Sequence, residues 1–400
     1  VSQPIILDSK IKFPKLGDSD IVIDGIFGAG LSRPATGLFG KLIDWINGSN
    51  QKKTVAIDIA SGLYCDQNTS GTKIIECNHT ISFQIPKLAF YLPQNSKYVG
   101  ELEIVGIGLD EKYITSIKSE FFITNKEFAQ GILKNRNRHD HKGTMGRNLI
   151  IAGSKGKMGA AVLCAKACLR SGAGLVTTYI PQVGYNIMQV ASLESMVITD
   201  YGEDFISDIP NISDYDSIGI GPGIGISEPT AKAVFKLLSK SKKPLVLDAD
   251  ALNIISSNNL IDLVPEGSIL TPHPGEFERL AGKWMTDFER LQKQIDLSKK
   301  HGLVILLKGA YTSISDANGK VYFNSTGNPG MATGGSGDVL TGIITSLMGQ
   351  GYNSLESALF GAYLHGLAGN LFAEQESEEG LIASDIINLL PKAFSELRMK

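Results

Sequence analysis

GNPGMATGGSGDVLTG, residues 327–342 of the 400-residue chain, places five glycines ahead of an aspartate and an apolar run. Glycine in an ordered segment costs conformational entropy, so a stretch this rich in glycine needs a physical reason. A glycine-rich turn that leads into a helix presents free backbone N–H groups and the positive end of the helix dipole. The stretch therefore predicts that an anion, most naturally a phosphate, approaches the backbone here, with Asp338 beside it.

Asp338 has two interpretations at this stage. Aspartate is a good helix N-cap, so the residue could simply begin the helix that follows. Capping alone does not require GGSG in front of the aspartate. A base that takes a proton from a hydroxyl, while adjacent N–H groups hold a transferring phosphoryl group, requires both features. We therefore predict that Asp338 attends the attacking oxygen of a phosphoryl transfer.

The sequence around this stretch alternates strand-like and helix-like segments, which is typical of an α/β protein with a parallel sheet covered on both faces. Strands are predicted at residues 147–153, 174–180, 216–221, 243–250, 267–272 and 303–309, and helices at 159–172 and 338–351. Ligands bind such sheets at the carboxyl ends of the strands. Five unusual loops follow these strands, namely AGSKGKMGAA, GPGIG, DADALN, TPHPGE and KGAYTSI, and we expect them to form one pocket.

Four side chains in these loops could contact a ligand, and each also has a plain structural role. His273 stands between two prolines and should lie on the rim of the pocket. Lys308 could neutralise the charge of a phosphate, or could simply extend from the end of a strand into solvent. Asp248 and Asp250 could hold Mg²⁺ through water, or could cap the next helix. The GxxxxGK[ST] and GxGxxG phosphate-binding patterns are both absent, which argues against a dinucleotide-binding Rossmann site.

The first third of the chain predicts a second, smaller α/β unit. Strands are expected at residues 20–27, 53–62, 79–84 and 101–108, and a helix at 38–48. Residues 111–140 are polar and basic without a long period, as expected for a connection between domains. Because 400 residues exceed one hydrophobic core, we predict a domain at 1–112, a linker at 113–137 and a domain at 138–400.

Composition limits the classes of partner. The chain is 42% hydrophobic with a net charge of −3, which gives no general attraction to nucleic acid or anionic membranes. No apolar run approaches the length of a membrane span, and the first ten residues lack a signal-peptide pattern. Of the four cysteines, Cys164 and Cys168 are expected to be small core residues of one helix rather than metal ligands. Reduced thiols without an export signal favour the cytoplasm.

With these motifs established, residues from about 138 to 400 resemble the ADP/ATP-dependent NAD(P)H-hydrate dehydratases of the ribokinase-like superfamily. The matching stretches are HKGTMGRNLIIAGSKGKMGAA, GIGPGIG, LDADALN, ILTPHPGEFERL, LKGAYT and TGNPGMATGGSGDVLTG. The resemblance implies a doubly wound ribokinase-like sheet that repairs the S form of hydrated NADH or NADPH (NADHX or NADPHX). It implies that ADP or ATP, with Mg²⁺, phosphorylates the ring hydroxyl, and that loss of phosphate restores the dihydronicotinamide.

The resemblance also implies the residues of the site. The substrate-binding positions would be Ala160, Gly223, His273 and Asp338, with Asp338 as the base. The nucleotide-binding positions would be Lys308, Gly309, Ala310, Tyr311 and Thr312, together with Gly335, Ser336 and Gly337, whose N–H groups would form the anion hole.

Residues 20 to about 110 resemble the C-terminal half of the NAD(P)H-hydrate epimerase domain, a Rossmann-like α/β domain. The matching stretches are DIVIDGIFGAGLSRPATGLF, AIDIASGL and YVGELEIVGIGL. The resemblance implies potassium ligands at Asp24 and Ser61, a catalytic or hydrate-contacting carboxylate at Asp58, and a phosphate-binding loop. That loop would consist of Gly28, Ala29, Gly30, Leu31, Ser32, Arg33 and Pro34.

This second resemblance has departures from the family pattern. Ala60 stands where the family usually has Pro, and Phe39 where it often has Tyr. The family's upstream Asn-Asn-Gly-Gly-Asp-Gly loop has no counterpart in the sequence. We therefore expect the epimerase domain of this chain to be incomplete.

Two other functions stay open from sequence alone. One is a ribokinase-like kinase for a sugar or vitamin alcohol, since GGSGD serves the first half of either reaction. TPHPGE and KGAYT together favour the dehydratase. The other is a nucleotide-binding module without turnover, which would not need a carboxylate at Asp338. Both resembled families commonly self-associate, so a homo-oligomer is expected, with a small-molecule substrate as its other partner.

Overall fold

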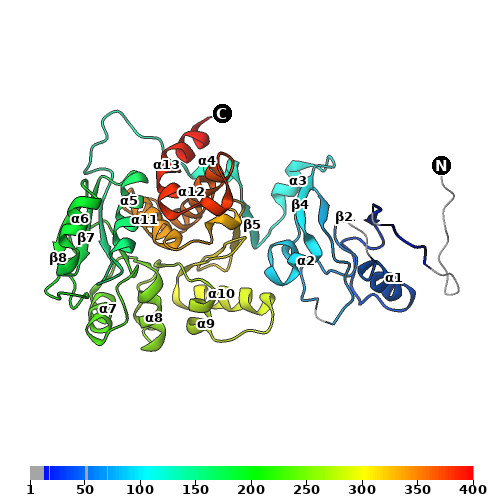
Figure 1. The fold of residues 1–400 in the computed structure, drawn as a ribbon, viewed down its shortest axis with the longest axis horizontal. Coiled ribbons are helices and arrows are strands. Elements are labelled where there is room, and N and C mark those ends of the chain that lie inside the picture. The colour runs from blue at the N-terminus through cyan, green and yellow to red at the C-terminus, as the bar shows by residue number, and fades with distance from the viewer. Residues whose placement is uncertain (1–12, 18, 50–52, 70, 400) are drawn as a thin grey trace. The chain divides into compact units, whose positions relative to one another are not determined.

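A computed structural model describes residues 13–399 except 18, 50–52 and 70, and it divides the chain into two compact units (Figure 1). Unit 1 comprises Val1–Ser119 and Met285–Arg290, and unit 2 comprises Glu120–Trp284 and Leu291–Lys400. The first ten residues, which lack a signal-peptide pattern, lie outside the described residues. None of the helices in the described part of the chain is long and apolar enough to cross a membrane.

Unit 1 is a small parallel α/β unit. Its four strands lie in the order in which they occur in the chain: β1 (Ile21–Asp24), β2 (Lys53–Ile57), β3 (His79–Phe83) and β4 (Glu101–Val105). Its helices are α1 (Gly37–Asn47), α2 (Ser96–Val99) and α3 (Glu111–Ser116), with 3-10 turns η1 (Leu88–Tyr91) and η2 (Pro93–Asn95). The predicted strands and the helix of this region are all present, although each strand is shorter than expected.

One face of the unit 1 sheet is open in the described structure. Ile21, Ile23 and Ile57 point to that face and are 61%, 67% and 41% exposed. The opposite face carries the buried Thr54, Ala56 and other small side chains. Parallel sheets usually bury both faces under helices, so this exposed apolar layer distinguishes unit 1 from a doubly wound domain.

Unit 2 is built on one ten-stranded sheet with the order β5-β14-β13-β12-β11-β10-β9-β6-β7-β8. The strands are β5 (Phe121–Thr124), β6 (Arg147–Ile151), β7 (Leu175–Ile180), β8 (Met196–Thr199), β9 (Ser217–Ile220), β10 (Val246–Leu247), β11 (Ile269–Leu270), β12 (Val304–Leu307), β13 (Ser313–Ser315) and β14 (Val321–Asn324). Only β13 runs antiparallel to its neighbours among the strands described. The strand order reverses direction around β6, and open parallel sheets bind ligands at the carboxyl ends of the strands beside such a reversal.

Helices cover both faces of this sheet (Figure 1). The helices of unit 2 are α4 (Lys126–Ile132), α5 (Met158–Arg170), α6 (Tyr185–Ala191), α7 (Glu228–Lys240), α8 (Ala249–Ser257), α9 (Pro274–Ala281), α10 (Asp287–His301), α11 (Ser336–Gly349), α12 (Ser354–Ala373) and α13 (Ala383–Arg398). The first four residues of α10 are assigned to unit 1. Helices α7 to α10 share one core with the sheet, whereas α5, α11 and α12 pack on the opposite face. Helices α4 and α13 lie outside α12, in a third apolar layer.

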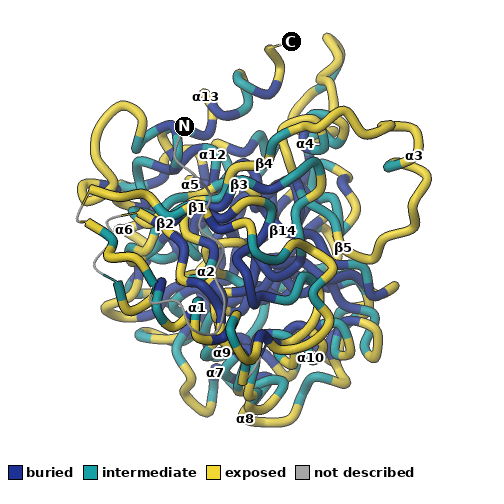
Figure 2. Tube along the Cα trace, turned by 90° about the vertical axis from the view of Figure 1, so that its right-hand side faces the viewer, coloured by how far each residue is buried: buried dark blue, intermediate teal, exposed yellow. Residues whose placement is uncertain are grey.

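The central strands of unit 2 are buried on both faces, as their continuous apolar runs predict. Strand β6 contains Leu149, Ile150 and Ile151, all 0% exposed, with odd and even positions entering different core clusters. By contrast α3 has no buried residue, and the chain around it is exposed (Figure 2). Cys164 and Cys168 are 0% exposed on α5, so their assignment to the core is confirmed.

The predicted linker at 113–137 needs a correction. Residues 121–124 form β5, which pairs in parallel with β14, and Ala129 of α4 is fully buried against α12 and α13. The segment FFIT is too short to show a strand period, and its sheet partner lies about two hundred residues further along the chain. Local pattern therefore could not reveal it.

Candidate active site

The glycine-rich stretch forms a tight turn at the start of α11. Gly335 is the N-cap and has φ +91°, a left-handed conformation that side chains rarely adopt. A Cβ on Gly335 would also lie 2.5 Å from a methyl group of Leu163. The N–H groups of Gly335, Gly337 and Asp338 have no acceptor among the described residues. The turn thus leaves three donors at a helix N-terminus free for an anion. Of the three N–H groups that the resemblance assigns to the anion hole, those of Gly335 and Gly337 are free, whereas that of Ser336 donates to the carbonyl of Thr333 at 3.4 Å.

Asp338 lies in the first turn of α11, three positions after the N-cap. The interpretation of Asp338 as the N-cap is therefore wrong, because Gly335 holds that position. Burial and, to a smaller extent, the charge of Asp248 raise the pKa of Asp338, Lys308 partly opposes them, and the resulting pKa is about 6. A carboxyl group with a pKa this close to neutrality can accept and release a proton under physiological conditions.

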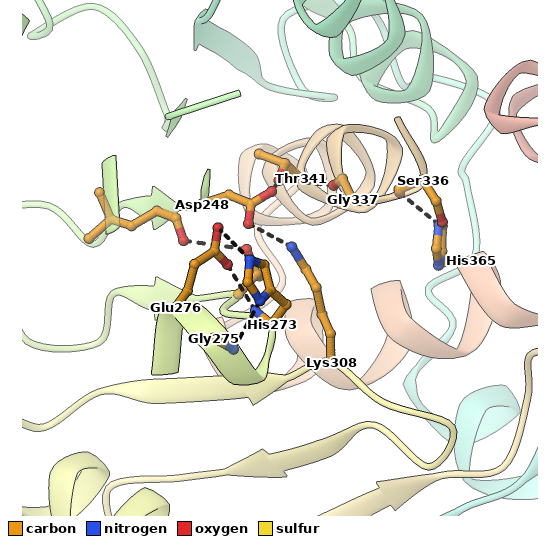
Figure 3. Close-up of polar contacts among 11 residues, drawn as sticks. Asp248, His273, Gly275, Glu276, Lys308, Ser336, Gly337, Thr341 and His365 are labelled. Atoms are coloured by element: carbon orange, nitrogen blue, oxygen red, sulfur yellow. Dashed lines mark hydrogen bonds and ion pairs between the residues drawn. The ribbon is translucent and has the colours of Figure 1, made fainter. Parts of the chain in front are cut away.

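A polar network supports the glycine-rich turn from below (Figure 3). The ammonium group of Lys308 donates to Oδ1 of Asp248 at 2.7 Å, and the hydroxyl of Thr341 donates to Oδ2 at 2.8 Å. Asp248 is 1% exposed and stands at the N-cap of α8, but its carboxylate makes no capping bond. A Cβ on Gly337 would lie 3.1 Å from Nζ of Lys308, which places that cation next to the free N–H groups.

The five loops expected to form one pocket do meet at one edge of the sheet. The hydroxyl of Ser154 donates to the carbonyl of Gly223 at 2.7 Å, and the N–H of Gly225 donates to Asp250 at 2.8 Å. Asp248 is bonded to Lys308, whose N–H in turn donates to the carbonyl of Pro272 at 2.9 Å. The five loops are thus connected to one another by hydrogen bonds at the edge where the carboxyl ends of the parallel strands lie.

Ala160 and Gly223 lie against each other at one end of this edge. Gly223 has φ +65°, and a Cβ there would lie 3.1 Å from Cβ of Ala160 and 3.0 Å from the carbonyl oxygen of Lys157. The backbone therefore approaches α5 too closely for a larger residue. Lys157, which sequence reasoning did not single out, has its ammonium group 3.5 Å from Asp250.

His273 is the N-cap of α9, where its Nδ1 accepts a hydrogen bond from the N–H of Gly275 at 3.0 Å. Nε2 lies 3.5 Å from Oε1 of Glu276, and the side chain is 53% exposed. The imidazole therefore has a structural role, and it also remains accessible on the pocket rim.

The proposed nucleotide positions 308–312 form the turn between β12 and β13. The hydroxyl of Thr312 donates to the carbonyl of Gly309 at 3.2 Å and closes the turn. A Cβ on Gly309 would meet nothing within 4 Å, and Tyr311 is 38% exposed. Gly309, Ala310 and Tyr311 therefore present an open surface beside Lys308.

His365 and Thr341 are site residues that sequence reasoning missed. His365 lies on α12, and its Nε2 is 3.0 Å from the carbonyl of Ser336 and 3.2 Å from the Ser336 hydroxyl (Figure 3). Burial lowers the pKa of His365 to about 4, so the ring is neutral near neutral pH. No local pattern marks this histidine, because α12 is apolar all round and His365 meets α11 only in the folded chain.

Unit 1 brings together the two residues that the resemblance assigns to potassium. The hydroxyl of Ser61 donates to Oδ1 of Asp24 at 2.6 Å, the Ser61 N–H donates to Oδ2 at 2.7 Å, and both residues are 1% exposed. Asp58 has φ +69° and pairs with Lys87, which sequence reasoning missed. Burial acts to raise the pKa of Asp58, but the bonds from Lys87 and from the N–H of Phe83 lower it overall.

The proposed phosphate-binding loop of unit 1 leads directly into α1. Positions 28–34 are exposed apart from the half-buried Leu31, and a Cβ on Gly28 or Gly30 would meet nothing within 4 Å. This loop and the Asp24–Ser61 pair belong to unit 1, so they form a group of residues separate from the pocket of unit 2.

Comparison with known proteins identifies both parts of the chain. Residues 148–392 match the family described as NAD(P)H-hydrate dehydratase, and residues 2–89 match the family described as the N-terminus of YjeF-related proteins. A bifunctional NAD(P)H-hydrate repair enzyme of Moorella thermoacetica is 36% identical over 390 residues, which cover 95% of this chain and 73% of the relative.

Solved structures agree with this assignment. An ADP/ATP-dependent NAD(P)H-hydrate dehydratase from Bacillus subtilis, co-crystallised with ATP/Mg²⁺, superposes with a TM-score of 0.61 at 29% identity, covering 69% of this chain and 98% of that one. A ribokinase-like protein from Enterococcus faecalis gives 0.63 at 27% identity, covering 70% and 98%. The expected ribokinase-like fold is confirmed, and the dehydratase is supported over the kinase. The chain belongs to the NAD(P)H-hydrate dehydratase family and, within it, to the bifunctional NAD(P)H-hydrate repair enzymes.

Proposed function

We propose that unit 2 uses ADP or ATP to convert the S form of NADHX or NADPHX back to NADH or NADPH. One observation carries this proposal: a half-buried carboxyl group with a pKa of about 6 stands beside free N–H groups at the start of α11. Such a pair can remove a proton from a hydroxyl while it holds the phosphoryl group that the hydroxyl attacks.

The residues of the pocket divide this chemistry between them. Asp338 takes the proton of the substrate hydroxyl, whose oxygen then bonds to the terminal phosphorus as the bond to the nucleotide breaks. The N–H groups of Gly335 and Gly337 stabilise the charge on the phosphoryl oxygens, and Lys308 supplies a cation beside them. Phosphate then leaves with the electrons of the C–O bond, and loss of a ring proton restores the double bond.

Mg²⁺ suits this pocket as a companion of the nucleotide. The described residues contain no cluster of three or more His, Cys, Asp or Glu able to hold a metal ion. Mg²⁺ commonly keeps several waters and binds through phosphates with one or two carboxylates, and Asp250 and Asp248 lie at the same sheet edge. When bound, the ion would neutralise charge on the transferring phosphates.

The function is tested by incubating the purified chain with S-form NADHX and either ADP or ATP, while following the absorbance band of reduced nicotinamide. We expect nucleotide-dependent recovery of NADH. Asp338→Asn should lose turnover by a factor on the order of 10² or more but bind nucleotide nearly normally, because only the base is removed. Wild-type turnover in this variant would contradict the role of Asp338.

For unit 1 we propose a relation to R/S hydrate epimerases, with potassium held near Asp24 and Ser61. The two side chains and the carbonyl of Phe27, 3.5 Å from the Ser61 hydroxyl, offer the oxygen ligands that hard cations take. The exposed apolar face of the unit 1 sheet supports our expectation that this chain does not epimerise. Pure R-form NADHX with K⁺ and excess nucleotide should react no faster than spontaneous epimerisation allows, and a clear acceleration would contradict this expectation.

We further propose that the chain acts in the cytoplasm and self-associates. Val190, Leu193 and Met196 lie at and before the edge strand β8 and are 80%, 78% and 49% exposed. Exposed apolar residues on an open sheet edge favour pairing with another chain. Light scattering on the purified protein measures the oligomeric state directly, and a monomer at all concentrations would contradict the proposal.

A further inference from the structure

Unit 2 has a second cavity at the sheet edge opposite the candidate active site. It has a volume of about 450 Å³, which is within the range of small-molecule sites. Met145 and Thr144 in its lining immediately precede β6, and Arg170 and Gln350 stand at the ends of α5 and α11. Strand starts and helix ends share the edge that faces away from the catalytic loops.

The lining of this cavity is strongly cationic. Lys134, Arg136, Arg170 and Arg398 line it, and Asp140 is the single carboxylate among its lining residues. The Asp140 carboxylate accepts a bond from the N–H of Asn137. Within the described part of the chain, none of the four cations forms an ion pair with a carboxylate.

Part of this charge has a structural use. Lys134 donates to the carbonyl of Gly351, and Arg136 donates to the carbonyl of Gly172, at 2.6 Å in each case. Cations stabilise helix C-termini in this way. These bonds use one donor of each side chain, so most of the guanidinium donors of Arg136 remain available.

The other two arginines are the last residues of their own helices, Arg170 of α5 and Arg398 of α13. Arg398 bonds to Asn135 and to the carbonyl of Lys134, and the Arg170 side chain makes no hydrogen bond or ion pair with any described residue. Both side chains are exposed at the cavity. Guanidinium groups match the geometry of phosphate oxygens, which can accept two parallel bonds from one arginine.

An unsatisfied hydroxyl lies close to the same cavity. Ser171 lines it and is 1% exposed, yet its Oγ has no hydrogen-bond partner among the described residues. Buried polar atoms without a partner are uncommon and need an explanation such as a ligand. The Ser171 Oγ itself is not accessible from the cavity, so the features that favour an anionic occupant are the cavity and its cations without ion-pair partners.

We propose that this cavity binds a small phosphate-bearing anion, at a site separate from the one that holds the reacting nucleotide. Arg136, Arg170 and Arg398 contact the phosphate oxygens, and Lys134 adds a fourth positive charge. Tyr352 and Phe394 form an apolar wall that leaves room for an organic group on the phosphate. The shared chemistry is the phosphoryl group, whether it arrives as inorganic phosphate or as an organic phosphate.

Inorganic pyrophosphate is a suitable probe, titrated by calorimetry into the complete chain. A saturating non-hydrolysable ATP analogue first fills the catalytic pocket, so that any remaining binding reports the second cavity. We expect the Arg170→Gln/Arg398→Gln variant to weaken this binding by about tenfold or more, as loss of charge-assisted contacts does. Thermal unfolding checks that the variant stays folded.

The matched control is Lys166→Gln/Lys392→Gln. These lysines are exposed on the same two helices, α5 and α13, but neither lines the cavity. The control removes the same net charge, and we expect its affinity to stay within about twofold of wild type. Absence of pyrophosphate binding to the saturated protein, or equal weakening in the two double variants, would overturn the proposal.

Discussion

Asp338 shows at the scale of one residue how burial of a carboxyl group reduces stability. Its pKa is about 6 in the folded chain, above the ordinary value of 3.8, because burial and Asp248 disfavour the charged form. The folded chain therefore binds more protons than the unfolded chain between about pH 4 and 6. In that window the free energy of unfolding falls as the pH rises. Above about pH 6 the whole decrease in the free energy of unfolding remains.

This pH dependence of the free energy of unfolding leads to a prediction for Asp338→Asn, which removes the carboxylate charge without changing the shape of the side chain. Near pH 8 we expect the variant to be more stable than wild type by on the order of 2 kcal/mol, and near pH 4 to be equal to it. Denaturant unfolding of both proteins at the two pH values measures the difference. An equal gain at both pH values would mean that packing, and not charge, is responsible.

At Gly337 the absence of a side chain is important for the close approach of phosphate to the backbone. A Cβ there would lie 3.1 Å from Nζ of Lys308 and 3.7 Å from Oδ2 of Asp248, so Val would occupy the space above the free N–H groups. We expect Gly337→Val to abolish nucleotide-dependent activity while the chain stays folded. Calorimetry should show that nucleotide affinity falls by at least about tenfold, and unchanged affinity would refute the close approach of phosphate.

At the scale of elements, the start of α11 depends on α12. His365 donates to the carbonyl of Ser336 from below the glycine-rich turn. We regard it as a positioning residue, because it would act on a ligand only through the N–H groups of that turn. We expect His365→Ala to raise the KM for nucleotide by about tenfold, since the donors lose their fixed orientation, and His365→Gln to restore most of the affinity through its own N–H.

A matched variant separates this effect from a general loss of packing. Leu371 lies on the same helix, is 5% exposed and packs in the core away from the turn. Leu371→Ala should lower the free energy of unfolding by about 2–5 kcal/mol and leave the KM for nucleotide unchanged. A KM increase of the same size in both variants would show that His365 acts only through stability.

The contacts between elements also explain which residues of the site could be predicted from the sequence and which could not. Gly335, Gly337, Asp338 and Lys308 lie in short motifs whose chemistry is local, and the structure brings all four together. Thr341 and His365 depend on how α11 meets Asp248 and α12, which no local pattern encodes. Strands β13 and β14 were missed for a related reason: they are short, and their pairing rather than their composition defines them.

At the scale of the whole molecule, β5 and α4 decide where unit 2 begins. Phe122 stacks on Tyr322 of β14 at 5.0 Å between ring centroids, and Phe128 lies 6.0 Å from the same ring. Removing residues 120–137 would therefore expose Tyr322, which is 8% exposed, and leave β14 as an open edge strand. Both changes cost stability and favour aggregation.

Two polypeptides test this boundary, one spanning residues 120–400 and the other 138–400. The first keeps β5 and α4, so we expect its thermal midpoint to stay within a few degrees of the unit 2 transition in the complete chain. The second loses an edge strand and the buried Ala129, and we expect its midpoint to fall by several degrees or more, with aggregation visible on size exclusion. Equal midpoints would place the start of the catalytic unit at residue 138 and reduce β5 to an accessory strand.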